Sequence, residues 1–142
     1  MMATWMLIVN HYTPSLLMRN SGNGYFTDIT TGSGLESLPN GIFQALMRDF
    51  DNDGFVDLLY AGGVEAGFYH NNGNGTFTPQ ALGLLSSGGQ QLRSFVVGDF
   101  NHDGFQDVYA SYYWGTATPD KLWLNNGNGN GYLPIILKGM GY

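Results

Sequence analysis

Short apolar segments alternate with glycine-rich polar segments along the 142 residues of the chain. The apolar segments are rich in Phe, Tyr, Val, Ile and Thr, as in IFQALMRD at 42–49 and FVDLLYAG at 55–62. Such segments favour β-strands over helices, because aromatic and β-branched side chains pack well on a pleated surface and glycine clusters end each segment early. The pattern therefore predicts an all-β protein.

Two phrases recur with a regular period. The asparagines that open the glycine-rich phrases, Asn20, Asn71 and Asn125, are separated by 51 and 54 residues, and Asp49 and Asp99, which open the acidic phrases, are separated by 50. One full unit contains a strand, an acidic loop, a second and a third strand, an Asn-Gly turn and a fourth strand. A repeated four-stranded antiparallel unit of this length is typical of a propeller blade.

The repeats predict a single repeat domain over residues 1–142 with about three β-propeller-like blades. We expect blade 1 at about 1–40, blade 2 at about 41–90 and blade 3 at about 91–142. The first unit lacks the first strand and the acidic loop. Because closed propellers need at least about four blades, the expected shape is an open arc rather than a closed ring within one chain.

Composition narrows the classes of partner and cofactor. The formal net charge is −6 and only five residues are Lys or Arg, so no basic surface is available for nucleic acid. The chain has no cysteine, so a metal must bind through oxygen or histidine. The apolar segment ATWMLIV is too short to span a bilayer, and we expect a strand there and no membrane insertion.

The acidic phrases DFDNDGFVD at 49–57 and DFNHDGFQD at 99–107 hold seven of the eleven acidic residues. Oxygens at positions 1, 3 and 5 can converge on one hard cation, and the glycine at position 6 permits a sharp bend. Position 12 holds Tyr60 and Ala110 in place of the glutamate of an EF-hand, so the pattern indicates a calcium loop in a β-hairpin. The alternative is a pair of solvated Asp-Gly turns.

The acidic phrases, together with the NNGNG segments that follow them, resemble FG-GAP or VCBS repeats, the calcium-loop blades of integrin-α-type propellers. The resemblance covers nearly the whole chain and implies two Ca²⁺ sites. Their implied ligands are Asp49, Asp51, Asp53, the Phe55 carbonyl and Asp57 in the first loop, and Asp99, Asn101, Asp103, the Phe105 carbonyl and Asp107 in the second.

Members of this family usually act outside the cell in adhesion, ligand binding or as scaffolds, and seldom as the catalytic part. We therefore expect a non-enzymatic, calcium-binding structural or adhesion module that is extracellular or at the cell surface. Unpaired blade edges predict a homo-oligomer, head to tail, as a filament or a ring. A calcium-dependent lectin-like module, with a glycan or surface protein as partner, and a non-catalytic segment of a larger secreted enzyme are the alternatives.

Three further features have a structural and a functional interpretation. His11, His70 and His102 share no spacing, which favours ordinary surface or strand positions. The aromatic segment YASYYWG at 109–115 suits packing between blades better than a sugar-binding surface. Asn74 begins an NGT sequence that fits both an N-glycosylation acceptor and the repeated Asn-Gly turn.

Overall fold

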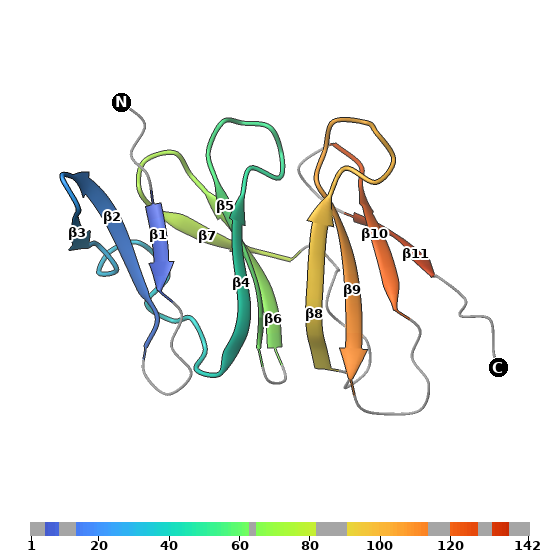
Figure 1. Cartoon of the computed structure of the whole chain (residues 1–142), viewed down its shortest axis with the longest axis horizontal. Helices are drawn as coiled ribbons and strands as arrows, with labels where there is room; N and C mark the ends of the chain where they lie inside the picture. Colours follow the sequence, from blue (N-terminus) through green and yellow to red (C-terminus); the bar gives the residue numbers. More distant parts are fainter. Residues whose placement is uncertain are drawn as a thin grey trace.

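The protein is represented by a computed structural model that describes residues 5–8, 14–62, 65–81, 91–113, 120–127 and 132–136. These residues form three antiparallel sheets and contain no helix. The sheets stand side by side in chain order, as Figure 1 shows. The predicted all-β fold, an open propeller-like arc, is confirmed for the described residues.

Neighbouring strands in the chain pair with each other in every sheet, as expected for units joined by hairpins. The first sheet has three strands, and the second and third have four each. The first sheet contains β1 (Trp5–Ile8), β2 (Leu16–Gly22) and β3 (Tyr25–Asp28). The second contains β4 (Ile42–Arg48), β5 (Asp57–Gly62), β6 (Glu65–Asn71) and β7 (Phe77–Gln80). The third contains β8 (Gln91–Gly98), β9 (Asp107–Tyr113), β10 (Lys121–Asn125) and β11 (Tyr132–Ile136).

The Asn-Gly turns differ between repeats. Asn23 and Gly24 both have positive φ, 55° and 80°, in the two-residue turn between β2 and β3, as the sequence predicts. The turn between β6 and β7 is longer, and there the positive φ angles belong to Gly73 and Gly75 but not to Asn74. The side chain of Asn74 instead accepts a hydrogen bond from the amide of Thr76 at 3.0 Å.

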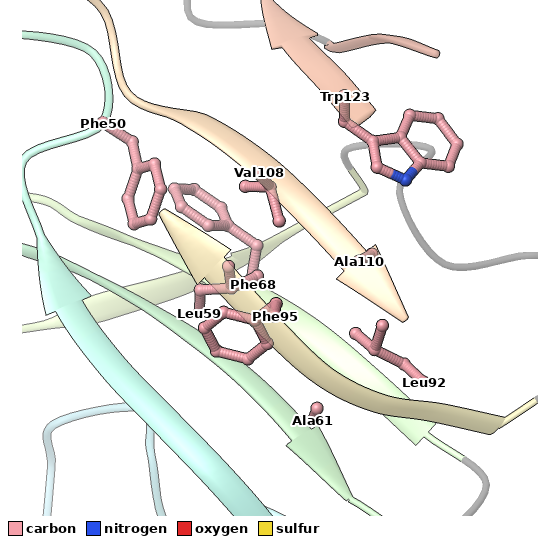
Figure 2. Close-up of a cluster of buried hydrophobic side chains, with 9 residues drawn as sticks. All are labelled: Phe50, Leu59, Ala61, Phe68, Leu92, Phe95, Val108, Ala110 and Trp123. Carbon is pink, nitrogen blue, oxygen red and sulfur yellow. The ribbon is translucent and has the colours of Figure 1, made fainter. Parts of the chain in front are cut away.

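The second sheet lies between two hydrophobic cores, so strand β5 is buried along its whole length. Successive side chains on a strand point to opposite faces. Leu58 and Tyr60 accordingly pack toward the core that includes Leu17 of the first sheet. The other face contributes to the core between the second and third sheets, drawn in Figure 2. Its buried members are Phe50, Leu59, Ala61, Phe68, Leu92, Phe95, Val108, Ala110 and Trp123.

Polar contacts also join the second and third sheets. A bulge lies between Ile42 and Gln44 on β4, and the Gln44 side chain bonds to both backbone groups of Phe95 on β8. Its amide donates to the Phe95 carbonyl at 2.9 Å and its oxygen accepts from the Phe95 amide at 3.0 Å. The β4–β5 and β8–β9 connections, which hold the acidic phrases, lie at the same end of the two sheets (Figure 1).

Candidate metal sites in the acidic loops

The loop from Asp49 to Asp57, here called loop 1, joins β4 to β5 and is bent by its own carboxylates. Gly54, with φ of 90°, donates its amide to Asp49 Oδ2 at 3.0 Å. The Phe55 amide donates to Asp53 Oδ1 at 2.8 Å. Because each carboxylate accepts from a backbone amide a few residues later, the aspartates define the turn as well as offer oxygens to a ligand.

Asp57 anchors loop 1 to the sheet. Its side chain is 0% exposed, and its two oxygens accept bonds from the amides of Phe50 at 3.1 Å and Asn71 at 2.9 Å. Burial raises the pKa of Asp57 to about 6, although both amide bonds act in the opposite direction. The interior therefore penalises the charge of this carboxylate, and a nearby cation would relieve that penalty.

Loop 1 gathers more carboxylate oxygens than its own hydrogen bonds satisfy. Oxygens of Asp49, Asp51 and Asp57 lie within 4.8 Å of one another. Asp49 Oδ1 is buried and has no hydrogen-bond partner. The pKa of Asp51 is raised by burial and, to a smaller degree, by the charge of Asp53. A buried acceptor without a donor, in an all-oxygen cluster, fits a hard cation such as Ca²⁺.

The loop from Asp99 to Asp107, here called loop 2, repeats the frame of loop 1 between β8 and β9. Asp107 is 0% exposed and accepts bonds from the amides of Phe100 at 2.9 Å and Asn125 at 2.8 Å. Gly104, with φ of 90°, donates to Asp99 Oδ2 at 3.0 Å. The anchoring contacts of the two loops therefore correspond one to one.

The two loops differ in their unsatisfied oxygens. Both oxygens of Asp99 accept backbone amides, those of Asp103 and Gly104. The Asn101 side chain donates to Asp103 Oδ2 at 2.8 Å. In the described part of the chain, two groups of three acidic or histidine side chains lie close enough to hold a metal ion, and both contain aspartates of loop 1. Loop 2 offers the predicted side-chain oxygen ligands, but most of them already accept hydrogen bonds, chiefly from backbone amides.

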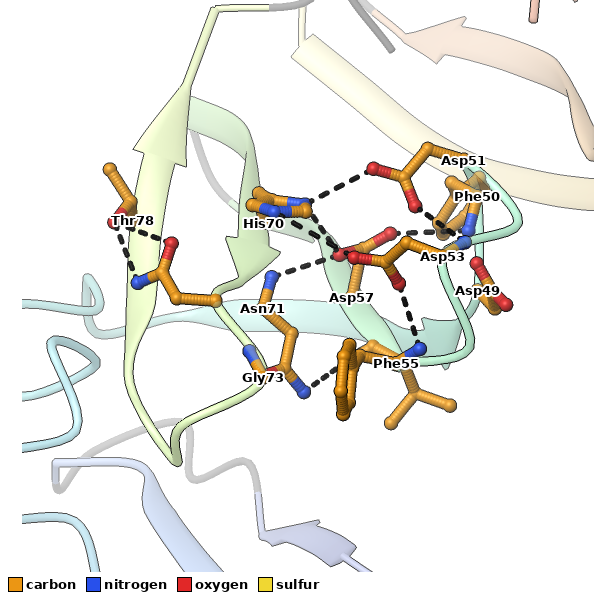
Figure 3. Close-up of polar contacts among 12 residues, drawn as sticks. Asp49, Phe50, Asp51, Asp53, Phe55, Asp57, His70, Asn71, Gly73 and Thr78 are labelled. Carbon is orange, nitrogen blue, oxygen red and sulfur yellow. Dashed lines mark hydrogen bonds and ion pairs between the residues drawn. The ribbon is translucent and has the colours of Figure 1, made fainter.

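His70 faces loop 1, a position that its sequence context did not suggest. Its Nδ1 atom lies 3.3 Å from Asp51 Oδ2 and 3.2 Å from Asp57 Oδ1, and Nε2 lies 3.9 Å from Asp53 Oδ2 (Figure 3). The register explains this contact, because Leu58 pairs with Tyr69 and the next residue of β6 comes opposite Asp57. Only strand pairing could have revealed it.

The asparagines that open the glycine-rich phrases hold the loops in place. Asn71 Nδ2 donates to the Val56 carbonyl at 3.0 Å, and Asn71 Oδ1 accepts the Gly73 amide at 3.0 Å. Asn125 makes the equivalent bonds to the Gln106 carbonyl at 3.3 Å and the Gly127 amide at 3.0 Å. The repeated Asn-x-Gly phrase was the available signal, but the sequence analysis assigned it to the turn alone.

The aromatic residue after each Asp-Gly pair covers a turn glycine. A Cβ atom on Gly73 would lie 2.7 Å from the Phe55 ring, and one on Gly127 would lie 2.5 Å from the Phe105 ring. Both glycines have positive φ, 74° and 68°. Close packing of ring on backbone therefore links each acidic loop to the hairpin turn that follows it.

The aromatic segment at 109–115 is divided between packing and polar contact. Tyr112 packs against the core between the second and third sheets, as predicted. The Tyr109 hydroxyl donates to Asp120 at 2.7 Å, which raises the pKa of Tyr109.

Trp114 lies outside the described residues, as does His11. His102 is exposed in loop 2 with φ of 62°.

Family models match most of the region that carries the two loops. The FG-GAP-like repeat matches residues 49–110, and the FG-GAP repeat matches residues 92–135. The two matches overlap and together run from the start of loop 1 to the last described strand. Residues 49–135 of the chain therefore contain FG-GAP repeats. The resemblance expected from the acidic and glycine-rich phrases is thereby confirmed for FG-GAP repeats.

The FG-GAP chain is also similar to Cartilage acidic protein 1 of Xenopus tropicalis. The two are 27% identical over 103 residues, which is 70% of this chain and 16% of the relative. The chain thus spans about one sixth of the relative's length. No helix of membrane-spanning length and hydrophobicity occurs in the described part of the chain.

Proposed function

We propose that this FG-GAP chain is a calcium-binding, non-catalytic structural module that acts outside the cell or at its surface. The observation that carries the proposal is the state of Asp49 Oδ1, a buried carboxylate oxygen without a hydrogen-bond partner, on a residue that clusters with Asp51 and Asp57. A carboxylate oxygen in that state is stabilised best by a cation that accepts oxygen ligands.

The proposed ligands follow the repeat. Calcium suits these loops better than magnesium, because a cage supplied wholly by protein oxygens accommodates six to eight ligands and tolerates irregular geometry. In loop 1 we assign Asp49, Asp51, Asp53, the Phe55 carbonyl and Asp57. In loop 2 we assign Asp99, Asn101, Asp103, the Phe105 carbonyl and Asp107. Loop 1 offers one more carboxylate and should bind Ca²⁺ more tightly.

The extracellular location rests on two supports. FG-GAP repeats resemble the blades of integrin-α-type propellers and of many bacterial surface and secreted proteins. The name of the relative, Cartilage acidic protein 1, associates that protein with cartilage. A calcium-stabilised module is also suited to the outside of cells, where loops of modest affinity stay occupied at the higher free calcium level.

Isothermal titration with CaCl₂ tests the calcium proposal. Wild-type protein should bind two ions, and Asp53→Ala and Asp103→Ala should each bind one. Glu36→Gln is the matched control, because Glu36 is an exposed acid outside both loops. Two sites in either loop variant, or tighter binding by loop 2, would contradict the assignment.

We further propose that the third sheet packs against a second copy of the chain, head to tail. Val96 and Phe100 are 59% and 47% exposed. They lie 50 residues after Leu46 and Phe50, which pack against the core between the second and third sheets. The exposed apolar residues of the third sheet thus correspond in sequence to those with which the second sheet contacts the third. If each chain used them to contact the next chain, the chains would form a filament or a ring.

Sedimentation at micromolar concentration in calcium buffer tests self-association. The wild type should form oligomers, and the double variant Val96→Ser with Phe100→Ser should be monomeric. Tyr25→Ser is the control, because Tyr25 is 74% exposed but lies on β3 of the first sheet. A wild-type monomer, or equal loss of assembly in the control, would contradict the proposal.

A further inference from the structure

We infer that loop 1 also binds a borderline transition ion of the Zn²⁺ class, through a ring nitrogen of His70 and the carboxylates of Asp51 and Asp53. Loop 2 lacks the equivalent strand histidine. The inference deepens the proposed function, because it uses the same acidic loop, but it assigns a ligand from β6 that lies outside the acidic phrase and gives the two loops different metal selectivity.

The geometry brings nitrogen and oxygen ligands together. The ligand atoms of His70, Asp51 and Asp53 all lie within 4.8 Å of one another. The separation of His70 Nδ1 from Asp51 Oδ2 is 3.3 Å, and that of Nε2 from Asp53 Oδ2 is 3.9 Å. A tetrahedral ion with bonds of about 2.0–2.2 Å places its ligands about 3.3–3.6 Å apart, which matches the separation of Nδ1 from Asp51. Asp53 faces the other ring nitrogen, so its carboxylate must turn toward an ion bound at Nδ1.

The buried oxygen of Asp49 shows that the part of loop 1 next to this cluster lacks a partner for its charge. Asp51 belongs both to the cluster with His70 and to the cluster with Asp49 and Asp57. His70 can carry at most one positive charge, whereas loop 1 carries four carboxylates. Even with the imidazole against Asp51 and Asp57, Asp49 Oδ1 remains buried and unpartnered. The imidazole of His70 therefore does not satisfy all the carboxylates of loop 1.

The chemistry of the donors selects the class of ion. Calcium is a hard cation that takes oxygen ligands, and an imidazole adds little to its binding. Imidazole nitrogen is a preferred ligand of Zn²⁺ and neighbouring first-row ions, for which carboxylates complete the set. A site of one His and two Asp thus accepts an ion that an all-oxygen loop would hold weakly.

The repeat supplies a natural comparison. In the third sheet, Trp123 pairs with Val108, so the next residue, Leu124, comes opposite Asp107. This is the position that His70 takes opposite Asp57 in the second sheet. Leu124 has no ligand atom. The two loops therefore share their acidic frame but differ at the one strand position from which a nitrogen reaches loop 1.

Titration of metal-stripped protein with ZnCl₂, and separately with CoCl₂, tests the inference. Wild-type protein should bind one Zn²⁺ at loop 1, and Co²⁺ should produce the visible absorption of a nitrogen-ligated ion. His70→Leu, which copies Leu124, should lower Zn²⁺ affinity at least about tenfold and abolish the Co²⁺ spectrum. Its Ca²⁺ titration should still give two sites.

Three controls keep the result decisive. His70→Gln retains an oxygen ligand and a polar side chain, so it decides the question if His70→Leu fails to fold. His102→Leu should leave Zn²⁺ binding unchanged, because His102 belongs to loop 2. Equal Zn²⁺ affinity in wild type and both His70 variants, or loss of binding in His102→Leu, would overturn the inference. Absence of Ca²⁺ binding in wild type would instead overturn the proposed function, and the Zn²⁺ titration would still test the inference separately.

Discussion

The side-chain amide of Asn125 donates a hydrogen bond of 2.6 Å to the backbone carbonyl of Phe50, 75 residues earlier in loop 1, next to the second sheet. Both residues are buried. Asn125 also holds Asp107 through its backbone amide, at 2.8 Å. One residue at the end of β10 therefore fixes loop 2 within its own sheet and fastens loop 1 to it.

Asn125→Ala should destabilise the protein more than Asn71→Ala. Both substitutions remove an amide bond to a loop carbonyl and an acceptor for a turn glycine, but only Asn125 also bonds across the sheets. The Phe50 carbonyl would be left buried without this donor, at a cost of about 1–3 kcal/mol. Urea unfolding of both variants measures the difference, and equal stabilities would contradict a role for the cross-sheet bond.

The metal-free protein should lose stability as the pH rises from about 4 to above 6. Burial raises the pKa of Asp57 from 3.8 to about 6, so the folded state binds more protons than the unfolded state between these values. The protonated carboxyl therefore stabilises the folded state fully below the unfolded pKa, and this contribution is lost as the pH passes the folded pKa. The free energy of unfolding should fall by up to about 3 kcal/mol.

Urea unfolding of metal-stripped protein at several pH values measures this slope. Asp57→Asn should flatten it, because the substituted side chain does not titrate. Glu36→Gln is the control and should keep the slope, because Glu36 is exposed and its pKa is lowered rather than raised. A wild-type stability that increases across the same window would contradict the assignment to Asp57.

The fold and the acidic loops could be predicted because their signals are local. Alternating apolar residues and glycine clusters specify strands, and aspartates at alternate positions before a glycine specify the turn that the amide of Gly54 closes onto Asp49. The same local signal recurs at Asp99 and Gly104. Repetition of one unit made both predictions stronger than either phrase alone.

The contacts that distinguish the loops could not be predicted, because they depend on pairing between distant segments. The position of His70 against Asp51 follows from the register of β5 with β6, and the bond from Asn125 to Phe50 follows from packing of one sheet on another. Neither relationship is encoded in the spacing of a motif. The unpartnered oxygen of Asp49, compared with the satisfied Asp99, likewise depends on the full loop conformation.

Removal of calcium should lower the unfolding temperature. A ligand that binds only the folded state adds stability by mass action, about 2.7 kcal/mol when its concentration is a hundredfold above the dissociation constant. Without the ion, the carboxylates of Asp49, Asp51 and Asp57 remain clustered and repel one another. Calorimetry with excess chelator at low salt measures the shift. The double variant Asp53→Ala with Asp103→Ala should show no such shift, and an unchanged wild-type transition would contradict calcium binding.

Gly73→Ala should destabilise the second sheet and weaken calcium binding at loop 1. The residue has φ of 74°, and a Cβ atom would lie 2.7 Å from the ring of Phe55, so the ring must move. Since Phe55 follows the Asp-Gly bend and donates its amide to Asp53, that movement disturbs the ligand loop.

Gly24→Ala is the matched control, because Gly24 has φ of 80° but nothing within 4 Å of an added Cβ. Both variants carry the backbone strain of about 1 kcal/mol, so only the excess in Gly73→Ala reports the ring contact. Thermal unfolding gives the stability and calcium titration gives the affinity. Equal losses of stability with unchanged calcium affinity would indicate that the contact between Phe55 and Gly73 does not support the loop.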